Sequence, residues 1–188
     1  PGIMHEARAF YTNLYTPDPI DTDSVESLLA YVPLVVCLSA SDQSGLVAPA
    51  TEDDIITLVS HSPLGKSPGL DGIPFEVYKY LVIRFAQVRS LLVATLNLAL
   101  DGIFPPSWTQ TRMVLLYKKG DPLSLKNWRP LSLINCDAKL FTKLLTRRFN
   151  GVLPKLINPY QTGFLPNRLI SDNGWVNNTL MAHFRSVA

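Results

Sequence analysis

The sequence predicts an α+β chain that is mostly helical and carries one short antiparallel hairpin. A long apolar stretch, Phe75 to Leu100, is typical of a buried helix. Apolar and basic residues alternate at helical spacing from Asp137 to Phe149, which predicts a basic amphipathic helix. Two short apolar runs, 111–118 and 129–135, are separated by turn residues and loop, so we interpret them as the paired strands.

Composition narrows the class of protein. With 188 residues, of which 47% are hydrophobic, the chain is long enough to bury one sizeable core. Its two cysteines are far apart and its three histidines are scattered, which excludes a disulfide framework or a zinc cluster by spacing. The apolar stretches are too short or too interrupted by charge or proline to span a bilayer. We therefore expect an intracellular protein, cytoplasmic or nuclear, with no membrane contact.

Other elements follow from local signals. Amphipathic helices are predicted for residues 4–15 and 24–31, and another for 51–61, where Thr51 precedes three acids suited to a helix N-terminus. Residues 32–40 fit helix or strand equally. Residues 62–74, with three prolines and three glycines, predict a shaped loop, and residues 171–184 predict a last helix. The chain begins at Pro1 rather than methionine, which suggests a piece of something longer.

The net charge of +2 conceals a division between the two halves of the chain. Residues 1–100 hold 5 Lys/Arg and 11 Asp/Glu, a net −6, whereas residues 101–188 hold 12 and 4, a net +8. Residues 112–155 alone carry ten basic and two acidic residues. A basic segment of this kind suits a polyanion such as nucleic acid. A solvated helix face with solubilising charge explains the same composition equally well.

The hairpin is the most specific feature of the sequence. Lys118 and Lys119 end the first strand, and Arg129 begins the second, so three cations come together near one end of the hairpin. An ammonium and a planar guanidinium are the groups that best hold a triphosphate. The alternative is a basic surface hairpin in which Trp128 packs into the core.

Five sequence boxes, in this order, resemble the N-terminal part of the reverse transcriptases of non-LTR (LINE-type) retrotransposons. The resemblance covers about residues 6–180, and its boxes are KSPGLDGIP at Lys66, FPPSW at Phe104, LLYKKGDP at Leu115, NWRPLSLIN at Asn127 and QTGFLPNR at Gln161. It implies a partial right-hand polymerase fold, with fingers and an incomplete palm. The implied domains are an N-terminal helical extension, residues 1–62, and truncated fingers with the start of the palm, residues 63–188.

The resemblance also implies roles for individual residues. Lys118, Lys119 and Arg129 would contact the phosphates of the incoming nucleotide, and Gln161 and Arg168 would line the pocket for template and nucleotide. Phe164, in the same box, is equally well explained as core. Lys66, Gly69 and Asp71 would lie near the template strand, although a purely structural connector explains this loop equally well. Further nucleic-acid contacts are expected from the basic segment, at Lys126, Lys143, Arg147 and Arg148.

Polymerisation of this type requires two divalent metals held by aspartates. The sequence contains no aromatic-x-Asp-Asp box, and Asp53 and Asp54 are better explained as acids at a helix start. We therefore expect no catalytic residue, metal site or cofactor in this chain, and no activity from it alone, while the complete family enzyme would use Mg²⁺. The resemblance implies an RNA template, a DNA primer and deoxynucleotide triphosphates as partners. The alternatives are a non-catalytic nucleic-acid-binding module and an inert remnant of a retroelement.

Overall fold

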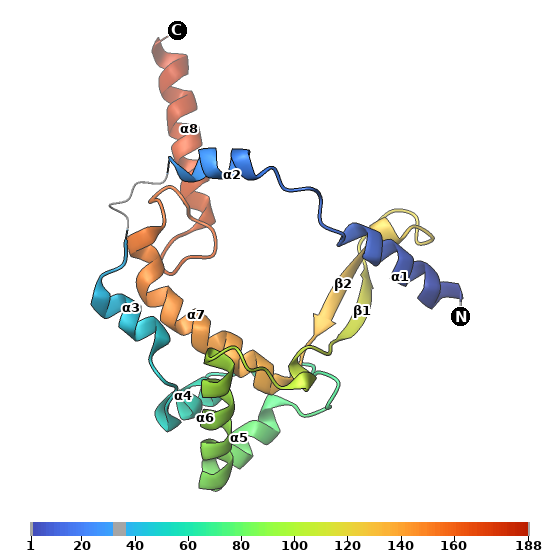
Figure 1. Cartoon of the computed structure of the whole chain (residues 1–188). Coiled ribbons are helices and arrows are strands. Elements are labelled where there is room, and N and C mark those ends of the chain that lie inside the picture. The colour runs from blue at the N-terminus through green and yellow to red at the C-terminus, as the bar shows by residue number, and fades with distance from the viewer. Residues whose placement is uncertain (1, 32–36, 188) are drawn as a thin grey trace.

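The computed structural model describes residues 2–31 and 37–187 and confirms a mostly helical α+β architecture with one two-stranded antiparallel sheet (Figure 1). The described residues of the first half of the chain form six helices: α1 (Gly2–Leu14), α2 (Thr22–Leu29), α3 (Ala40–Val47), α4 (Glu52–Ser60), α5 (Phe75–Arg84) and α6 (Ala86–Leu100). The second half forms β1 (Arg112–Tyr117), β2 (Trp128–Leu133), α7 (Cys136–Leu156) and α8 (Ile170–Val187), with short 3₁₀ turns at Pro106–Trp108 and Leu125–Asn127.

The hydrophobic core lies where α4, α5, α6 and α7 meet (Figure 1). Its fully buried side chains include Ile55 from α4, Val82 from α5, Leu96 from α6, and Leu140 and Leu144 from α7. The leucines of α7 are four residues apart and therefore lie on one face of the helix. The sequence predicted this apolar face, and α7 extends seven residues beyond the predicted end at Phe149, with Pro154 inside its last turns.

The acid-rich start of α4 forms the predicted cap. The Thr51 side chain accepts from the Asp54 amide at 3.2 Å, and Asp54 Oδ2 accepts in turn from the Thr51 amide at 3.1 Å. This reciprocal capping box satisfies amides that have no partner within the helix. It fixes the start of α4, which contributes three buried residues to the core.

The prediction of one continuous helix from Phe75 to Leu100 was wrong. The chain leaves the helical conformation at Phe85 (φ −125°, ψ 110°), and α5 and α6 meet at a bend of 116°. The Arg89 guanidinium donates to the Val82 carbonyl at 2.9 Å and so satisfies an acceptor in the last turn of α5. On the two sides of this bend, α5 and α6 both pack against α4.

Helix α3 was missed, and residues 32–36 of the undecided segment lie outside the described residues. No single described helix is long and apolar enough to cross a membrane. Taken together, α5 and α6 have sufficient length and apolar composition, but they are bent by 116°. The predicted helices at 4–15, 24–31, 51–61 and 171–184 correspond to α1, α2, α4 and α8.

The loop between α4 and α5 packs against the junction of β2 and α7, near the end of the hairpin opposite its tip. Gly69 is buried there, and a β-carbon on it would lie 2.2 Å from Asn135 Oδ1 and 2.4 Å from the Asn135 backbone nitrogen. The same carboxamide oxygen accepts from the Asp71 amide at 3.4 Å. Only glycine permits this approach, because any side chain would collide with backbone.

Gly69→Ala should therefore destabilise the fold by about 1–3 kcal/mol, the usual cost of overpacking. Urea denaturation of the purified chain measures the change in the free energy of unfolding. Gly151→Ala is the matched control: it lies in α7 with open space around it, so alanine should be neutral or stabilising there. Equal stabilities for Gly69→Ala and the wild type would contradict the proposed steric role.

The ion pair between α4 and α6 predicts a dependence of stability on pH. Glu52 accepts from Arg89 Nε at 2.9 Å and from Ser90 Oγ at 3.2 Å, and chiefly the hydrogen bond from Arg89 holds the Glu52 pKa below its ordinary value of 4.5. A carboxyl whose pKa is lower in the folded than in the unfolded state stabilises above the unfolded value, and this contribution is lost as the pH falls through the folded value. The melting temperature should therefore drop below about pH 4.5, and Glu52→Gln should lose less stability on acidification than wild type. Glu26→Gln, at an exposed position on α2, should retain the wild-type pH profile.

Candidate nucleic-acid interface

The hairpin brings Lys118 and Arg129 onto the same face. Leu116 lies directly opposite Arg129 and Tyr117 opposite Trp128 in the antiparallel register. Pairing continues one step further, because the Lys118 amide donates to the Asn127 carbonyl at 2.9 Å. Alternate residues of a strand share a face, so Lys118 follows Leu116 onto the side of Arg129.

The loop at the hairpin tip is held by its own side chains. The Trp128 indole donates to the Pro122 carbonyl at 3.0 Å, Asn127 Nδ2 donates to the Asp121 carbonyl at 2.9 Å, and the Tyr117 hydroxyl donates to the Gly120 carbonyl. The Tyr117 and Trp128 rings also make an edge contact at 5.3 Å. Trp128 thus packs within the hairpin, and the alternative that places it in the helical core is wrong.

Four cations near the tip of the hairpin have no polar partner among the described residues. Lys118, Lys119, Lys126 and Arg129 make no side-chain hydrogen bond or ion pair with any residue that the structure describes. All four residues are exposed, the three lysines in and near the loop and Arg129 on β2. Their charge is therefore available to a partner outside the described chain.

The cations of α7, by contrast, hold the fold together. Lys139 Nζ donates to the Ser67 carbonyl at 3.1 Å, and Lys143 Nζ donates to Ser62 Oγ at 2.8 Å, so both tie the 62–74 loop to the helix. Arg148 donates to the Leu46 carbonyl at 3.0 Å and so binds the end of α3. Lys155 forms an ion pair with Asp42 of α3, with Nζ to Oδ1 at 2.7 Å.

The predicted site residues of the 62–74 loop have different surroundings. Lys66 is exposed and makes no side-chain bond within the described chain, whereas Gly69 is buried against Asn135. Asp71 is exposed, and its Oδ1 accepts from the Ile73 amide at 3.0 Å in a local turn. The structural connector foreseen as the alternative therefore describes Gly69 and Asp71 well, while a contact of Lys66 with a template stays a prediction.

Asn135 is the residue that sequence reasoning missed. It is 4% exposed, and besides its contacts with Gly69 and Asp71 it donates from Nδ2 to the Ser107 carbonyl at 3.5 Å. It thereby joins three of the five sequence boxes, at 66–74, 104–108 and 127–135. Its place between a strand and a helix was visible in the sequence, but the distant partners were not.

Arg168 organises the loop between α7 and α8. Its Nη1 donates to the carbonyls of Asn158 and Gln161, both at 2.7 Å, and its Nη2 donates to the Ile157 carbonyl at 3.3 Å. Gln161 is exposed and donates to the Gly163 carbonyl at 3.3 Å. Phe164 is fully exposed with a φ of 62°, so the alternative that makes it core is wrong.

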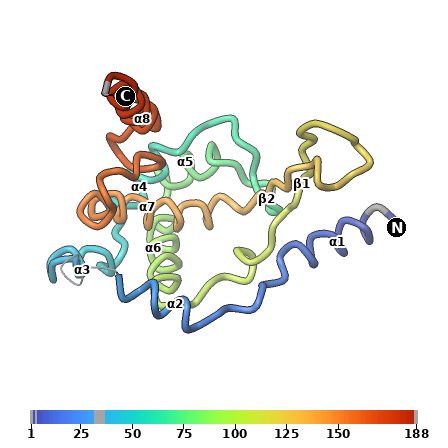
Figure 2. The backbone as a smooth tube through the Cα atoms, turned by 90° about the horizontal axis from the view of Figure 1, so that it is seen from above, coloured from blue at the N-terminus to red at the C-terminus, as the bar shows by residue number. Residues whose placement is uncertain are grey.

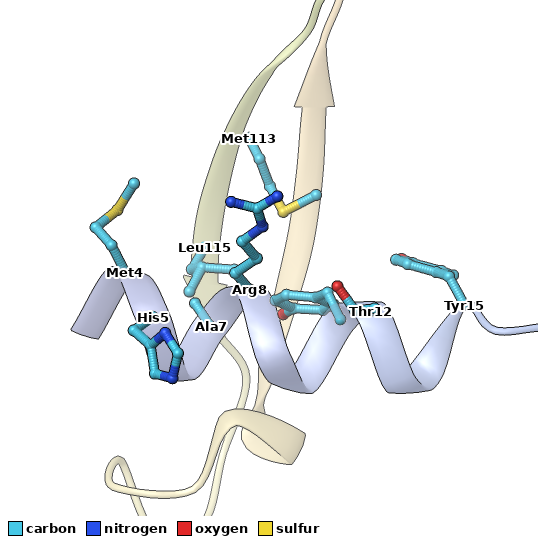
Figure 3. Close-up of a pocket in the computed structure, with 9 residues that line it drawn as sticks. Met4, His5, Ala7, Arg8, Thr12, Tyr15, Met113 and Leu115 are labelled. Carbon is cyan, nitrogen blue, oxygen red and sulfur yellow. The ribbon is translucent and has the colours of Figure 1, made fainter. Parts of the chain in front are cut away.

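An apolar pocket of about 740 Å³ lies between α1 and the hairpin (Figure 3). Tyr11, Thr12 and Tyr15 line it from α1, and Met113 and Leu115 line it from β1. The Arg8 side chain reaches toward Met113 (Figure 3). The Tyr11 hydroxyl is buried without a hydrogen-bond partner among the described residues, and burial raises the pKa of Tyr11. Seen from above, α1 lies beside the hairpin (Figure 2).

Within residues 2–31 and 37–187, no three side chains of His, Cys, Asp or Glu gather as a metal site.

The predicted basic residues fall into two groups. Those at the hairpin and Lys66 project outward, while Lys143, Arg148 and Arg168 bond within the chain, and Arg147 lies 3.6 Å from Asp54 in a partly exposed ion pair. Contacts of any of them with nucleic acid or nucleotide stay predictions.

No family model matches the chain. It is 35% identical, over 97% of its length, to the transposon TX1 uncharacterized 149 kDa protein of Xenopus laevis, and it spans 14% of that relative. It is also 28% identical over 63% of its length to the probable RNA-directed DNA polymerase from transposon BS of Drosophila melanogaster, and 28% identical over 52% to the retrovirus-related Pol polyprotein from type-1 retrotransposable element R2 of Popillia japonica. The chain spans 13% and 12% of these two relatives.

The similarity defines a class of protein: the chain is homologous to proteins encoded by transposable elements. More narrowly, it is related to the reverse transcriptases of non-LTR (LINE-type) retrotransposons, and the resemblance drawn from the five sequence boxes is confirmed. The chain spans only about an eighth of the length of these curated relatives.

Replacing Arg168 should loosen the 157–168 loop without melting the core. Lysine keeps the charge of Arg168 but lacks the planar fork that reaches three carbonyls, so Arg168→Lys should leave acceptors unsatisfied. Amide hydrogen exchange across residues 158–167 should accelerate about tenfold or more, which corresponds to a loss of about 1.4 kcal/mol in local opening. Arg185→Lys on the exposed face of α8 should leave exchange in this loop unchanged. Unaltered exchange in Arg168→Lys would contradict the organising role.

Proposed function

We propose that residues 63–188 form the fingers and the start of the palm of a reverse transcriptase, and that residues 1–62 are its N-terminal extension. In this proposal the chain binds nucleic acid and nucleotide phosphates as one part of a longer RNA-directed DNA polymerase. The relationship to retrotransposon proteins supports the ancestry. The aspartates and the Mg²⁺ that catalysis needs are assigned to parts of the enzyme outside these 188 residues, because the sequence has no aromatic-x-Asp-Asp box.

One observation carries the binding proposal: the unengaged cations concentrate on the hairpin. Lys118 and Arg129 share a face of the hairpin, and Lys119 and Lys126 lie in the adjoining loop. The loop is stiffened by three side-chain hydrogen bonds to its own carbonyls, so little order has to be gained on binding. Cations in a pre-ordered loop are suited to phosphates of an incoming nucleotide or of a template strand.

Phe164 supports the same function. It is a fully exposed aromatic side chain in a loop whose carbonyls are held by Arg168. Its positive φ is a conformation that a bulky residue adopts only when its surroundings enforce it, and such strain concentrates at functional sites. An exposed aromatic ring offers a stacking surface to an unpaired base.

Loss of hairpin charge should weaken binding to single-stranded RNA in a salt-dependent manner. In the double variant Lys118→Gln/Lys119→Gln, the slope of log affinity against log salt should become shallower by about 1.4, because each contact to a single strand contributes about 0.7. Fluorescence anisotropy with a labelled 20-nucleotide RNA, from about 50 to 200 mM salt, measures the slope.

The charge-matched control is Arg84→Gln/Arg185→Gln, which removes two exposed cations from α5 and α8. Equal slopes for the two double variants would defeat the assignment of the hairpin. Binding that is absent, or that does not depend on salt, would defeat the binding function and favour the inert remnant. Incubation of the same protein with a primed template, deoxynucleotides and Mg²⁺ should yield no extension, and extension would place catalysis within this chain.

A further inference from the structure

A second basic site lies on the helical core, between the end of α4 and the middle of α7. A pocket of about 480 Å³ is lined there by Thr57, Leu58 and His61 from the α4 side and by Lys143 and Arg147 from α7. Lys143 and Arg147 are four residues apart, so they lie one above the other on the same face of the helix. Three nitrogen-bearing side chains thus border one hollow.

Lys143 is fixed at this pocket rather than mobile in solvent. Its Nζ donates to Ser62 Oγ at 2.8 Å and lies over the Phe75 ring, 4.6 Å from the ring centroid. Burial chiefly lowers the pKa of Lys143; Cys136 opposes this shift, and the charges of Lys79 and Lys139 add to it. An ammonium has three donors, so a partly dehydrated one with a single hydroxyl partner retains capacity for an anion.

Arg147 is only weakly engaged by its acidic neighbour. The closest approach of its Nη1 to Asp54 Oδ1 is 3.6 Å, and the other oxygen of Asp54 is committed to the Thr51 amide and hydroxyl. The Arg147 side chain is 55% exposed, so such a pair contributes little to stability. Its guanidinium can bind a second anion without the loss of a strong bond.

His61 supplies the third group. Its Nδ1 lies 2.8 Å from the Thr57 carbonyl, which assigns the Nδ1 proton to that bond and leaves Nε2 for a ligand. His61 is also the C-cap residue of α4, and its ring lies at the rim of the pocket. The charged groups facing His61 are Lys143 and Arg147 on α7, with Asp54 behind Arg147.

We propose that this pocket binds one phosphate group of a nucleic-acid backbone, held by Lys143 and Arg147, with His61 at its rim. The inference rests on the proposed function in that it takes the bound strand to be nucleic acid. It differs from the hairpin site in its ligand, a single phosphate, and in its place on the helical core. A backbone phosphate and free inorganic phosphate offer the pocket the same chemistry, so the tests distinguish between these two ligands.

The first test uses the labelled 20-nucleotide RNA with Arg147→Gln, and Lys155→Gln is the matched control. Both residues are cations of α7 paired with an acid, but Lys155 pairs with Asp42 and is not part of the pocket. Arg147→Gln should weaken RNA binding about fivefold and reduce the salt slope by about 0.7, while Lys155→Gln retains wild-type values. Equal effects of the two substitutions would overturn the pocket.

The second test uses inorganic phosphate without nucleic acid. Phosphate should raise the melting temperature above that in chloride of equal ionic strength, for wild type and Lys155→Gln but not for Arg147→Gln. If RNA does not bind while phosphate stabilises, the pocket is a phosphate site and its assignment to a strand is overturned. If only the hairpin substitutions weaken RNA binding, and phosphate does not change the melting temperature, the pocket is not a phosphate site while the proposed function stands.

Discussion

The approach of Gly69 to Asn135 is the contact on which the arrangement of the fold depends. It joins the loop after α4 to the point where β2 ends and α7 begins, and so fixes the hairpin relative to the helical core. Because a β-carbon would collide with backbone at this point, the contact requires glycine. Asn135 then satisfies groups from the loop and from the Pro106–Trp108 turn with one buried carboxamide. Segments more than sixty residues apart are held at one position as a result.

The aromatic residues around the same position complete this junction. The ring centroids of Trp108 and Phe141 of α7 are 5.5 Å apart, and those of Phe104 and Phe141 are 5.8 Å apart. These contacts join the FPPSW segment to α7, next to the bonds that Asn135 makes. The Trp108 indole nitrogen is buried without a partner among the described residues, a cost that the packing of its ring has to offset. Three of the five boxes, at 66–74, 104–108 and 127–135, thus meet in one packed structural unit.

The opposite charges of the two halves serve two purposes. Acids from the first half meet cations of α7, at Asp42 with Lys155 and at Asp54 with Arg147, so part of the charge difference is used in joining α3 and α4 to α7. Other α7 cations bond to carbonyl or hydroxyl oxygens of loops and helix ends. The hairpin has no such acidic partners among the described residues, and its charge remains directed outward. The net charge of the sequence therefore overstates the amount of unpaired positive charge near α7. At the hairpin, the net charge and the exposed positive charge agree.

The sequence by itself determined the local elements: the capped start of α4, the hairpin, the amphipathic α7 and the boxes that relate the chain to retrotransposon reverse transcriptases. These features depend on neighbours in the chain, through turn residues, caps and periodicity. Only the tertiary structure decided the bend at Phe85, because no proline or glycine marks it and the gain comes from packing two helices on α4. The same holds for the division of cations into outward and internal groups, and for the meeting of His61, Lys143 and Arg147. His61 is 82 residues from Lys143 and 86 from Arg147 in the chain, so they become neighbours only through the fold, and no local pattern records them.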